Sequence, residues 1–99
     1  MSSDHVATIS PATLRPLRRE DQVVEREIDG SLVLYDHGHQ RVHVLNPTAS
    51  MIWQMCDGNH AAEEIAAQLA AMFPSHADAI PDDVASVLRM FAVERLLVA

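Results

Sequence analysis

The pattern of apolar and polar positions divides the chain into a strand-rich first part and a helical second part. Three short runs alternate apolar and polar residues or are rich in β-branched residues, which is typical of strands; they span residues 23–28, 32–35 and 41–45. Asp29-Gly30 predicts a two-residue hairpin between the first two runs, because both central positions of such a turn need a positive φ. A longer loop with Gly38 at its middle precedes the third run. The pattern therefore predicts a three-stranded antiparallel meander.

The third predicted strand has the clearest alternation. Its side chains divide into Val42 and Val44 on one face and Arg41, His43 and Leu45 on the other. In a meander the second strand is central, so the third strand is one of two edge strands.

The rest of the chain changes to the 3- and 4-residue spacing of helices. Asn46 and Pro47 predict the start of the first helix, since an asparagine side chain caps the free N–H groups and proline at the first position loses no hydrogen bond. This helix covers residues 48–55, and Asp57-Gly58 ends it. Its apolar face is formed by Ala49, Ile52, Trp53 and Cys56.

Two more helices follow. The second begins near Ala61, which has no capping side chain, so we expect Asn59 or His60 to cap its first turn. Its apolar face is predicted to hold Ile65, Leu69 and Met72, with Ala62 and Ala66 beside it. Phe73-Pro74 ends it. After a predicted loop over residues 75–80, the third helix starts at Pro81 and carries a stripe of Val84, Val87, Leu88 and Phe91.

Strands followed by helices indicate an α+β fold: a three-stranded antiparallel meander and then a three-helix bundle, similar to a winged helix-turn-helix. Residues 1–14 show no periodicity, and we expect residues 1–19 to form a flexible N-terminal tail before one domain over residues 20–99. The basic cluster of residues 15–19 is interpreted as a solvated lead-in; a docking patch for an acidic partner is the alternative.

Charge and composition narrow the function classes. The chain of 99 residues has a net charge of −7 and no lysine. Residues 1–45 hold five arginines against seven acids, and residues 46–99 hold two against seven. An acidic helical half is a poor match for nucleic acid, because affinity for phosphates comes from basic groups. The absence of a long apolar run, of a signal peptide and of a second cysteine predicts no membrane partner and a cytoplasmic location.

Few residues suggest catalysis or metal binding. His37, His39 and His43 are a possible metal set, but no cysteine or fixed fourth ligand lies near them, so solvated loop histidines are favoured. Cys56 lies beside the acidic Asp57, which favours a packed thiol over a nucleophile. We find no glycine-rich phosphate loop and no sign of convergent carboxylates. We therefore expect no enzyme, no catalytic residue, no metal and no cofactor.

An ordered set of residues resembles the PqqD family, small proteins named after pyrroloquinoline quinone biosynthesis. The set comprises Leu45-Asn46, Ala49, Ile52-Trp53, Cys56-Asp57-Gly58, Glu64-Ile65, Asp83-Val84, Leu88 and Leu96-Leu97. The resemblance implies a peptide chaperone that binds the leader of a ribosomally made precursor peptide and presents it to a maturation enzyme, as a monomer or weak homodimer.

The resemblance also implies where the peptide lies: between the third strand and the third helix, as a strand added to a sheet edge. Met90 suits such a surface because methionine adapts to different partners. Arg41 and Arg89 are expected to meet acids in the leader. The implied peptide-binding residues are Arg41, Val42, His43, Val44, Leu45, Asp83, Val87 and Met90. Two alternatives stay open: a winged-helix DNA-binding regulator, against which the charge argues, and a structural subunit of a larger enzyme.

Overall fold

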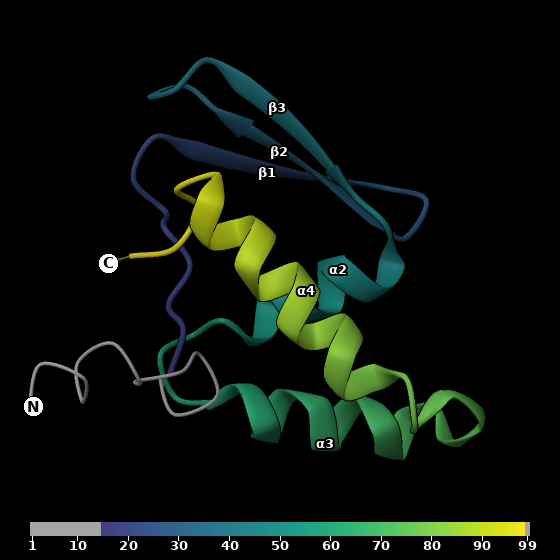
Figure 1. Cartoon of the computed structure of the whole chain (residues 1–99). Coiled ribbons are helices and arrows are strands. Elements are labelled where there is room, and N and C mark those ends of the chain that lie inside the picture. The colour runs from purple at the N-terminus through teal and green to yellow at the C-terminus, as the bar shows by residue number, and fades with distance from the viewer. Residues whose placement is uncertain (1–14, 99) are drawn as a thin grey trace, which may run out of the picture.

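The computed structural model describes residues 15–98, so the expected flexibility of residues 1–14 lies outside the described part of the chain. A three-stranded sheet comes first and the helices follow (Figure 1). The elements are β1 (Val23–Ile28), β2 (Ser31–Asp36), β3 (Arg41–Leu45), α2 (Pro47–Met55), α3 (Ala62–Met72), the short 3₁₀ helix η2 (Pro74–His76) and α4 (Ile80–Val93). The predicted α+β fold, an antiparallel meander followed by three helices, is confirmed.

The sheet has the order β1-β2-β3, with both pairs antiparallel. Asp29 and Gly30 have φ angles of 53° and 83°, the positive values that the predicted two-residue turn needs. Because side chains alternate along a strand, Leu32, Leu34 and Asp36 of β2 share one face, where they are 5%, 0% and 1% exposed. This buried face is the one that the helices cover.

The helices pack together on that single face of the sheet. In Figure 1, α4 runs diagonally between the sheet and α3, with α2 beside it. Trp53 of α2 meets Phe91 of α4 edge to face, with 5.3 Å between the ring centroids, and both are fully buried. The core cluster comprises Leu32, Leu34, Leu45, Ala49, Ile52, Trp53, Cys56, Ala62, Ile65, Ala66, Leu69, Ile80, Val84, Leu88, Phe91 and Leu96.

The junction between β3 and α2 forms as its sequence predicts. The Asn46 side chain accepts a 2.8 Å hydrogen bond from the N–H of Ala49, and Pro47 is the first helical residue. Ser50, one turn into the helix, is buried and bonds back to the sheet. Local chemistry therefore fixes the direction in which the chain leaves β3.

The start of α3 differs from the prediction that Asn59 or His60 caps it. Ala61 occupies the cap position, and its N–H donates to the Glu64 carboxylate at 2.7 Å. His60 and the backbone of Asn59 instead bond to Asp57 at 3.0 and 2.9 Å. The Glu64 carboxylate, at the third position of the helix, thus accepts a hydrogen bond from the backbone N–H at the cap position. The prediction that Asn59 or His60 provides the cap was wrong because the partner lies inside the helix.

The start of α4 and the position of Met72 also differ from the prediction. The segment over residues 75–80 is not wholly a loop: η2 occupies its start, and α4 already begins at Ile80, which is 4% exposed. Burial of the Ile80 side chain favours including it in the helix. Met72, predicted on the apolar face of α3, is 55% exposed because the helix ends there, beyond the packed core.

The basic segment before β1 is attached to the fold rather than solvated. Leu17 and Arg18 form isolated β-bridges with Asp57 and Leu97. The N–H of Arg18 donates to Cys56 O at 2.8 Å, and the N–H of Arg19 donates to Leu96 O at 2.7 Å. A predicted tail up to residue 19 is therefore too long, because backbone bonds bring residues 17–19 between the end of α2 and the end of the chain.

Candidate functional site

The backbone of β3 has hydrogen-bonding groups that point away from the sheet. In the two-residue hairpin between β1 and β2, the flanking residues Ile28 and Ser31 exchange backbone bonds, and bonded pairs then alternate along both strands. Ser31, Val33 and Tyr35 of β2 thus bond to β1, which leaves the other half of β2 to bond to β3.

The bonded half of β2 consists of Leu32, Leu34 and Asp36, whose partners on β3 are Leu45, His43 and Arg41. The N–H and C=O groups of the two remaining residues, Val42 and Val44, consequently point to the open edge. The parity of the edge, which the sequence leaves open, is thereby settled.

A side chain from α2 supports this assignment at the end of the ladder. The N–H of Leu32 donates to the Ser50 hydroxyl at 2.9 Å, and that hydroxyl donates to Leu45 O at 3.2 Å. The N–H of Leu32 therefore points toward β3 and reaches it through the hydroxyl. Ser50 also holds the start of α2 against the last residue of the edge strand.

The side chains of β3 divide unequally between solvent and the core. Val42 and Val44 are 61% and 72% exposed on the face away from the helices. On the helix-facing side, Leu45 is 1% exposed and belongs to the core, so its side chain is not available to a surface ligand. His43 is half-buried, and its Nε2 is a buried nitrogen without a hydrogen-bond partner among the described residues. Arg41 is exposed at the start of the strand.

The residues expected on α4 are placed at the edge of the core. Asp83 is exposed in the first turn. Val87 and Met90 are partly buried and pack against the core cluster. Arg89 is exposed on the same helix. Apolar surface at Val87 and Met90 is thus accessible in part, as an adaptable contact surface requires.

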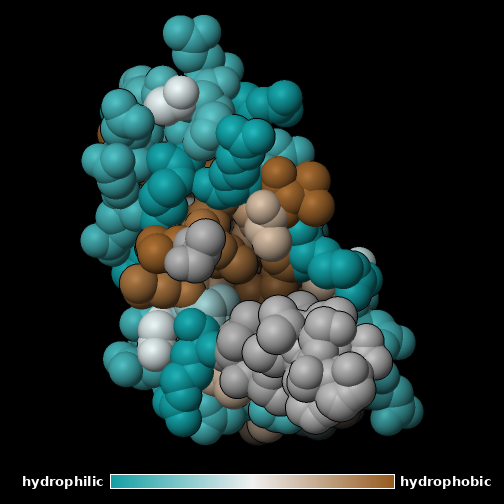
Figure 2. All heavy atoms as spheres, turned by 60° about the vertical axis from the view of Figure 1, so that its left-hand side comes forward, coloured by the Kyte–Doolittle hydropathy of each residue, from teal (hydrophilic) through white to brown (hydrophobic). Residues whose placement is uncertain are grey.

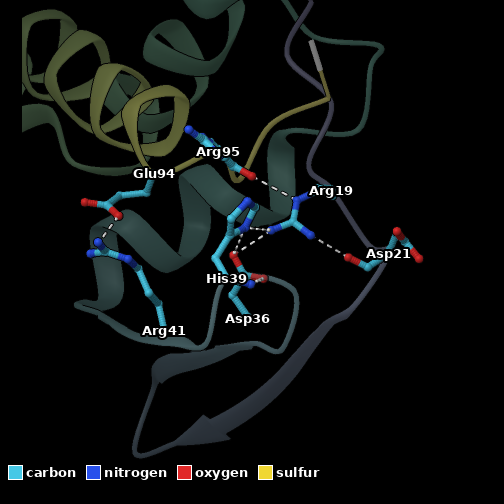
Figure 3. A network of polar contacts seen from close by, with 7 residues as sticks. All are labelled: Arg19, Asp21, Asp36, His39, Arg41, Glu94 and Arg95. Carbon is cyan, nitrogen blue, oxygen red and sulfur yellow. Dashed lines mark hydrogen bonds and ion pairs between the residues drawn. The ribbon is translucent and has the colours of Figure 1, made fainter.

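The start of β3 and the end of α4 are joined by one ion pair. Arg41 Nη1 lies 3.5 Å from Glu94 Oε1, and Figure 3 shows the two side chains reaching toward each other. Beside them is an open pocket of about 320 Å³, lined by His39, Arg41, Val93, Glu94 and Arg95. Of the predicted site residues, Arg41 is the one that the structure brings into this contact with the α4 side.

A buried acid holds the loop beside this pocket. Asp36 Oδ2 accepts hydrogen bonds from Arg19 at 2.6 Å and from His39 Nδ1 at 2.9 Å (Figure 3). Burial alone would raise the pKa of Asp36, but the bonds from Arg19 and His39 outweigh it and hold that pKa well below its usual range. His39 is therefore a fixed member of a polar network rather than a solvated loop histidine.

Arg19 extends this network to the far end of the chain. Its guanidinium donates to Arg95 O at 2.9 Å and to Asp21 O at 2.7 Å. Sequence reasoning missed Arg19, Glu94 and Arg95, because their partners are distant along the chain. The basic charges of residues 15–19 were the only sequence signal for these contacts. From the local pattern we predicted those residues to be solvated.

The structure also places the cysteine and the possible metal ligands that the sequence analysis considered. Cys56 is fully buried, and burial raises the pKa of its thiol to about 12. Within residues 15–98, no three His, Cys, Asp or Glu side chains are arranged to hold a metal ion. None of the helices in this part of the chain has both the length and the apolar character of a transmembrane span.

A second surface feature lies on the side that holds the end of the described chain. Figure 2 shows an apolar band across the middle of this face, with polar side chains above it. Leu17 and Val98, joined by a 2.8 Å backbone bond, are 42% and 52% exposed and line an open pocket of about 320 Å³ with Arg18, Glu20 and Asp57. This surface is separate from the edge of β3.

Comparisons with known proteins agree with this geometry. The family model described as coenzyme PQQ synthesis protein D (PqqD) matches residues 31–97. The chain belongs to the PqqD family. A solved structure described as TbiB1 in complex with the TbiA(beta) leader peptide is 26% identical, with a TM-score of 0.70 over 82% of this chain and 94% of that one. No curated protein matches the chain. The matched region spans β2, β3 and all three helices, which are the elements that carry the predicted site.

Proposed function

We propose that this PqqD-family protein binds the leader of a ribosomally synthesised precursor peptide and presents it to a modifying enzyme. The observation that carries the proposal is the open edge of β3, where the outward backbone groups of Val42 and Val44 have no partner within residues 15–98 and can pair with an incoming strand. Family membership and the similarity to a leader-peptide complex support it.

The contacts of the bound leader follow from the edge. Its backbone pairs with Val42 and Val44, and one face of its side chains turns toward α4, where Val87 and Met90 supply apolar contact. The other face lies beside the exposed valines. Backbone bonds supply affinity without regard to sequence, and the side-chain contacts on the α4 side supply selectivity.

The modifying chemistry belongs to a separate maturation enzyme in this proposal. The protein itself contributes binding and orientation, as a monomer or weak homodimer in the cytoplasm, where ribosomes make the precursor. Light scattering of the protein with and without a bound peptide measures the oligomeric state; a stable higher oligomer would contradict this part.

The DNA-binding alternative receives no support from the charge of the chain. A net charge of −7 opposes binding to phosphates, and α3 and α4 contain a single arginine between them, Arg89, against four acids. A low-salt gel shift with sequence-specific retardation would favour that alternative over the chaperone.

Selection from a display library of random linear peptides tests the proposal. The full chain is the bait, and a selected peptide is then titrated into labelled protein while backbone amide resonances are followed. We expect the amides of Val42 and Val44 to shift and to become protected from hydrogen exchange, because they gain bonds to the peptide. Glu27, on the opposite edge of the sheet, is the internal control. Selected peptides that leave β3 unperturbed, or a selection that yields none, would contradict the proposal.

A further inference from the structure

The pocket between the start of β3 and the end of α4 has a local charge opposite to that of the whole chain. Arg41 and Arg95 line it against one acid, Glu94, while the chain carries −7. Of the described residues, no carboxylate forms an ion pair with the Arg95 guanidinium. The acid of the neighbouring network, Asp36, is buried and already neutralised by Arg19. An anion in this pocket would therefore meet uncompensated positive charge.

The pocket is also continuous with the proposed peptide edge. Arg41 is the first residue of β3 and projects on the helix-facing side, two residues before His43. A strand added to β3 would place one of its own inward side chains beside Arg41. Glu94 now occupies that neighbourhood, 3.5 Å from the guanidinium (Figure 3).

The contact between Arg41 and Glu94 is weak enough to be exchanged. The two side chains are 63% and 30% exposed, and ion pairs that are this exposed contribute little to stability because solvent screens them. A carboxylate carried by a bound strand can replace Glu94 on Arg41 and also lies within the pocket that Arg95 lines.

We propose that this pocket selects an acidic side chain of the leader, with Arg41 and Arg95 as specificity-determining residues and Glu94 as the internal competitor that the leader displaces. This inference rests on the proposed function and names the class of residue that the site reads. It predicts one position of the bound peptide at which Asp or Glu is preferred.

The test compares selections from the same random peptide library on the wild-type chain and on charge variants. We expect one acidic position in the peptides selected by the wild type. Arg41→Gln and Arg95→Gln should each weaken that preference, and Glu94→Gln should strengthen it by removing the competitor. Arg26→Gln is the matched control, because it removes an exposed arginine of β1 that does not line the pocket.

Affinities of one selected peptide and its Glu→Gln counterpart complete the test. The counterpart should bind the wild type about three- to fivefold more weakly, the effect of about 0.6–1 kcal/mol, and the difference should shrink in high salt and disappear in Arg41→Gln. Peptides that bind at β3 without an acidic preference would overturn this inference and leave the proposed function standing. An acidic preference that survives both arginine substitutions would also overturn it. Failure to obtain any binding peptide would overturn both proposals.

Discussion

The two edges of the sheet are built from the same fold but are suited to different roles. β1 has the sequence Val-Val-Glu-Arg-Glu-Ile, so half of its residues are charged, whereas β3 has one charged residue, Arg41, at its start. By the alternation that starts at the hairpin, Glu25 and Glu27 are outward-bonding residues of β1, as Val42 and Val44 are of β3. Charged side chains along an edge discourage pairing with another strand.

The neighbours of the two edges differ as well. On β1, the Glu25 carboxylate accepts a 2.9 Å bond from the Trp53 indole and lies 3.8 Å from Arg18, so it is tied to the core and the N-terminal segment. On β3, Arg41 forms an ion pair with Glu94 at the end of α4, and Val87 and Met90 of that helix are only partly buried against the core. If the peptide binds at β3 as proposed, we expect recognition to need side-chain contacts beside the strand as well as an open edge.

The largest expected effect comes from removing the core that supports both edges. Trp53→Ala should lower the free energy of unfolding by about 3–5 kcal/mol, because the side chain is fully buried against Phe91. It also removes the indole that holds Glu25 of β1. Denaturant titration measures the loss, and a loss under about 1 kcal/mol would show that the packing of Trp53 is not what supports the sheet.

A smaller effect is expected from removing the ion pair between Arg19 and Asp36, the last residue of the central strand β2. Arg19→Ala should lower the free energy of unfolding by about 3 kcal/mol, the lower end of the range for leaving a buried acid unpaired. Asp36 would keep only its bonds to His39. The double variant Arg19→Ala with Asp36→Asn is the control, and should recover part of the stability because no charge is left buried. Equal losses in the single and double variants would contradict the interpretation.

The same network predicts the acid side of the stability profile. The pKa of Asp36 is lowered in the folded protein from about 3.9 in the unfolded chain. Its contribution is therefore fully present above that value and is lost as the pH falls toward the folded pKa. Asp36→Asn should flatten the profile below about pH 4. Asp57, whose pKa is lowered by the Asn59 N–H and by His60, remains in both proteins, so their difference isolates Asp36.

The smallest effects are expected from proline substitutions, each of which removes one backbone N–H. These substitutions test directly which of the two edges binds the peptide. Val44→Pro should leave the domain folded and weaken a selected peptide about tenfold, since losing one bond costs on the order of 1 kcal/mol and about 1.4 kcal/mol corresponds to a decade. Glu27→Pro removes an outward N–H from β1 and is the matched control, with unchanged affinity. His43→Pro removes an inward N–H and should destabilise the meander itself.

Calorimetry with the selected peptide, and thermal melts of the three variants, measure these outcomes. Unchanged affinity in folded Val44→Pro would exclude strand addition at β3. A loss in Glu27→Pro of the same size would place the peptide on β1 instead, and the comparison of the two edges would be reversed.

Features with a local cause were determined by the sequence alone. Asp29-Gly30 specified the hairpin, and Asn46-Pro47 specified the start of α2, because turn and cap chemistry depends on residues adjacent in the chain. The alternation of β3 likewise separated Val42 and Val44 from its other residues. The 3.6-residue period placed Trp53 and Phe91 in the core.

Only the tertiary structure decided which side of each strand is buried and which distant residues are in contact. Alternation divides β3 into two sides but does not say which side the helices cover, and the apolar Val42 and Val44 prove to be the exposed pair. The polar contacts of the site join residues far apart in the chain: Arg19 bonds to Asp36 across 17 positions and to Arg95 across 76. Such pairs leave no periodic signal in the sequence, because their proximity is created by the packing of the helices on the sheet.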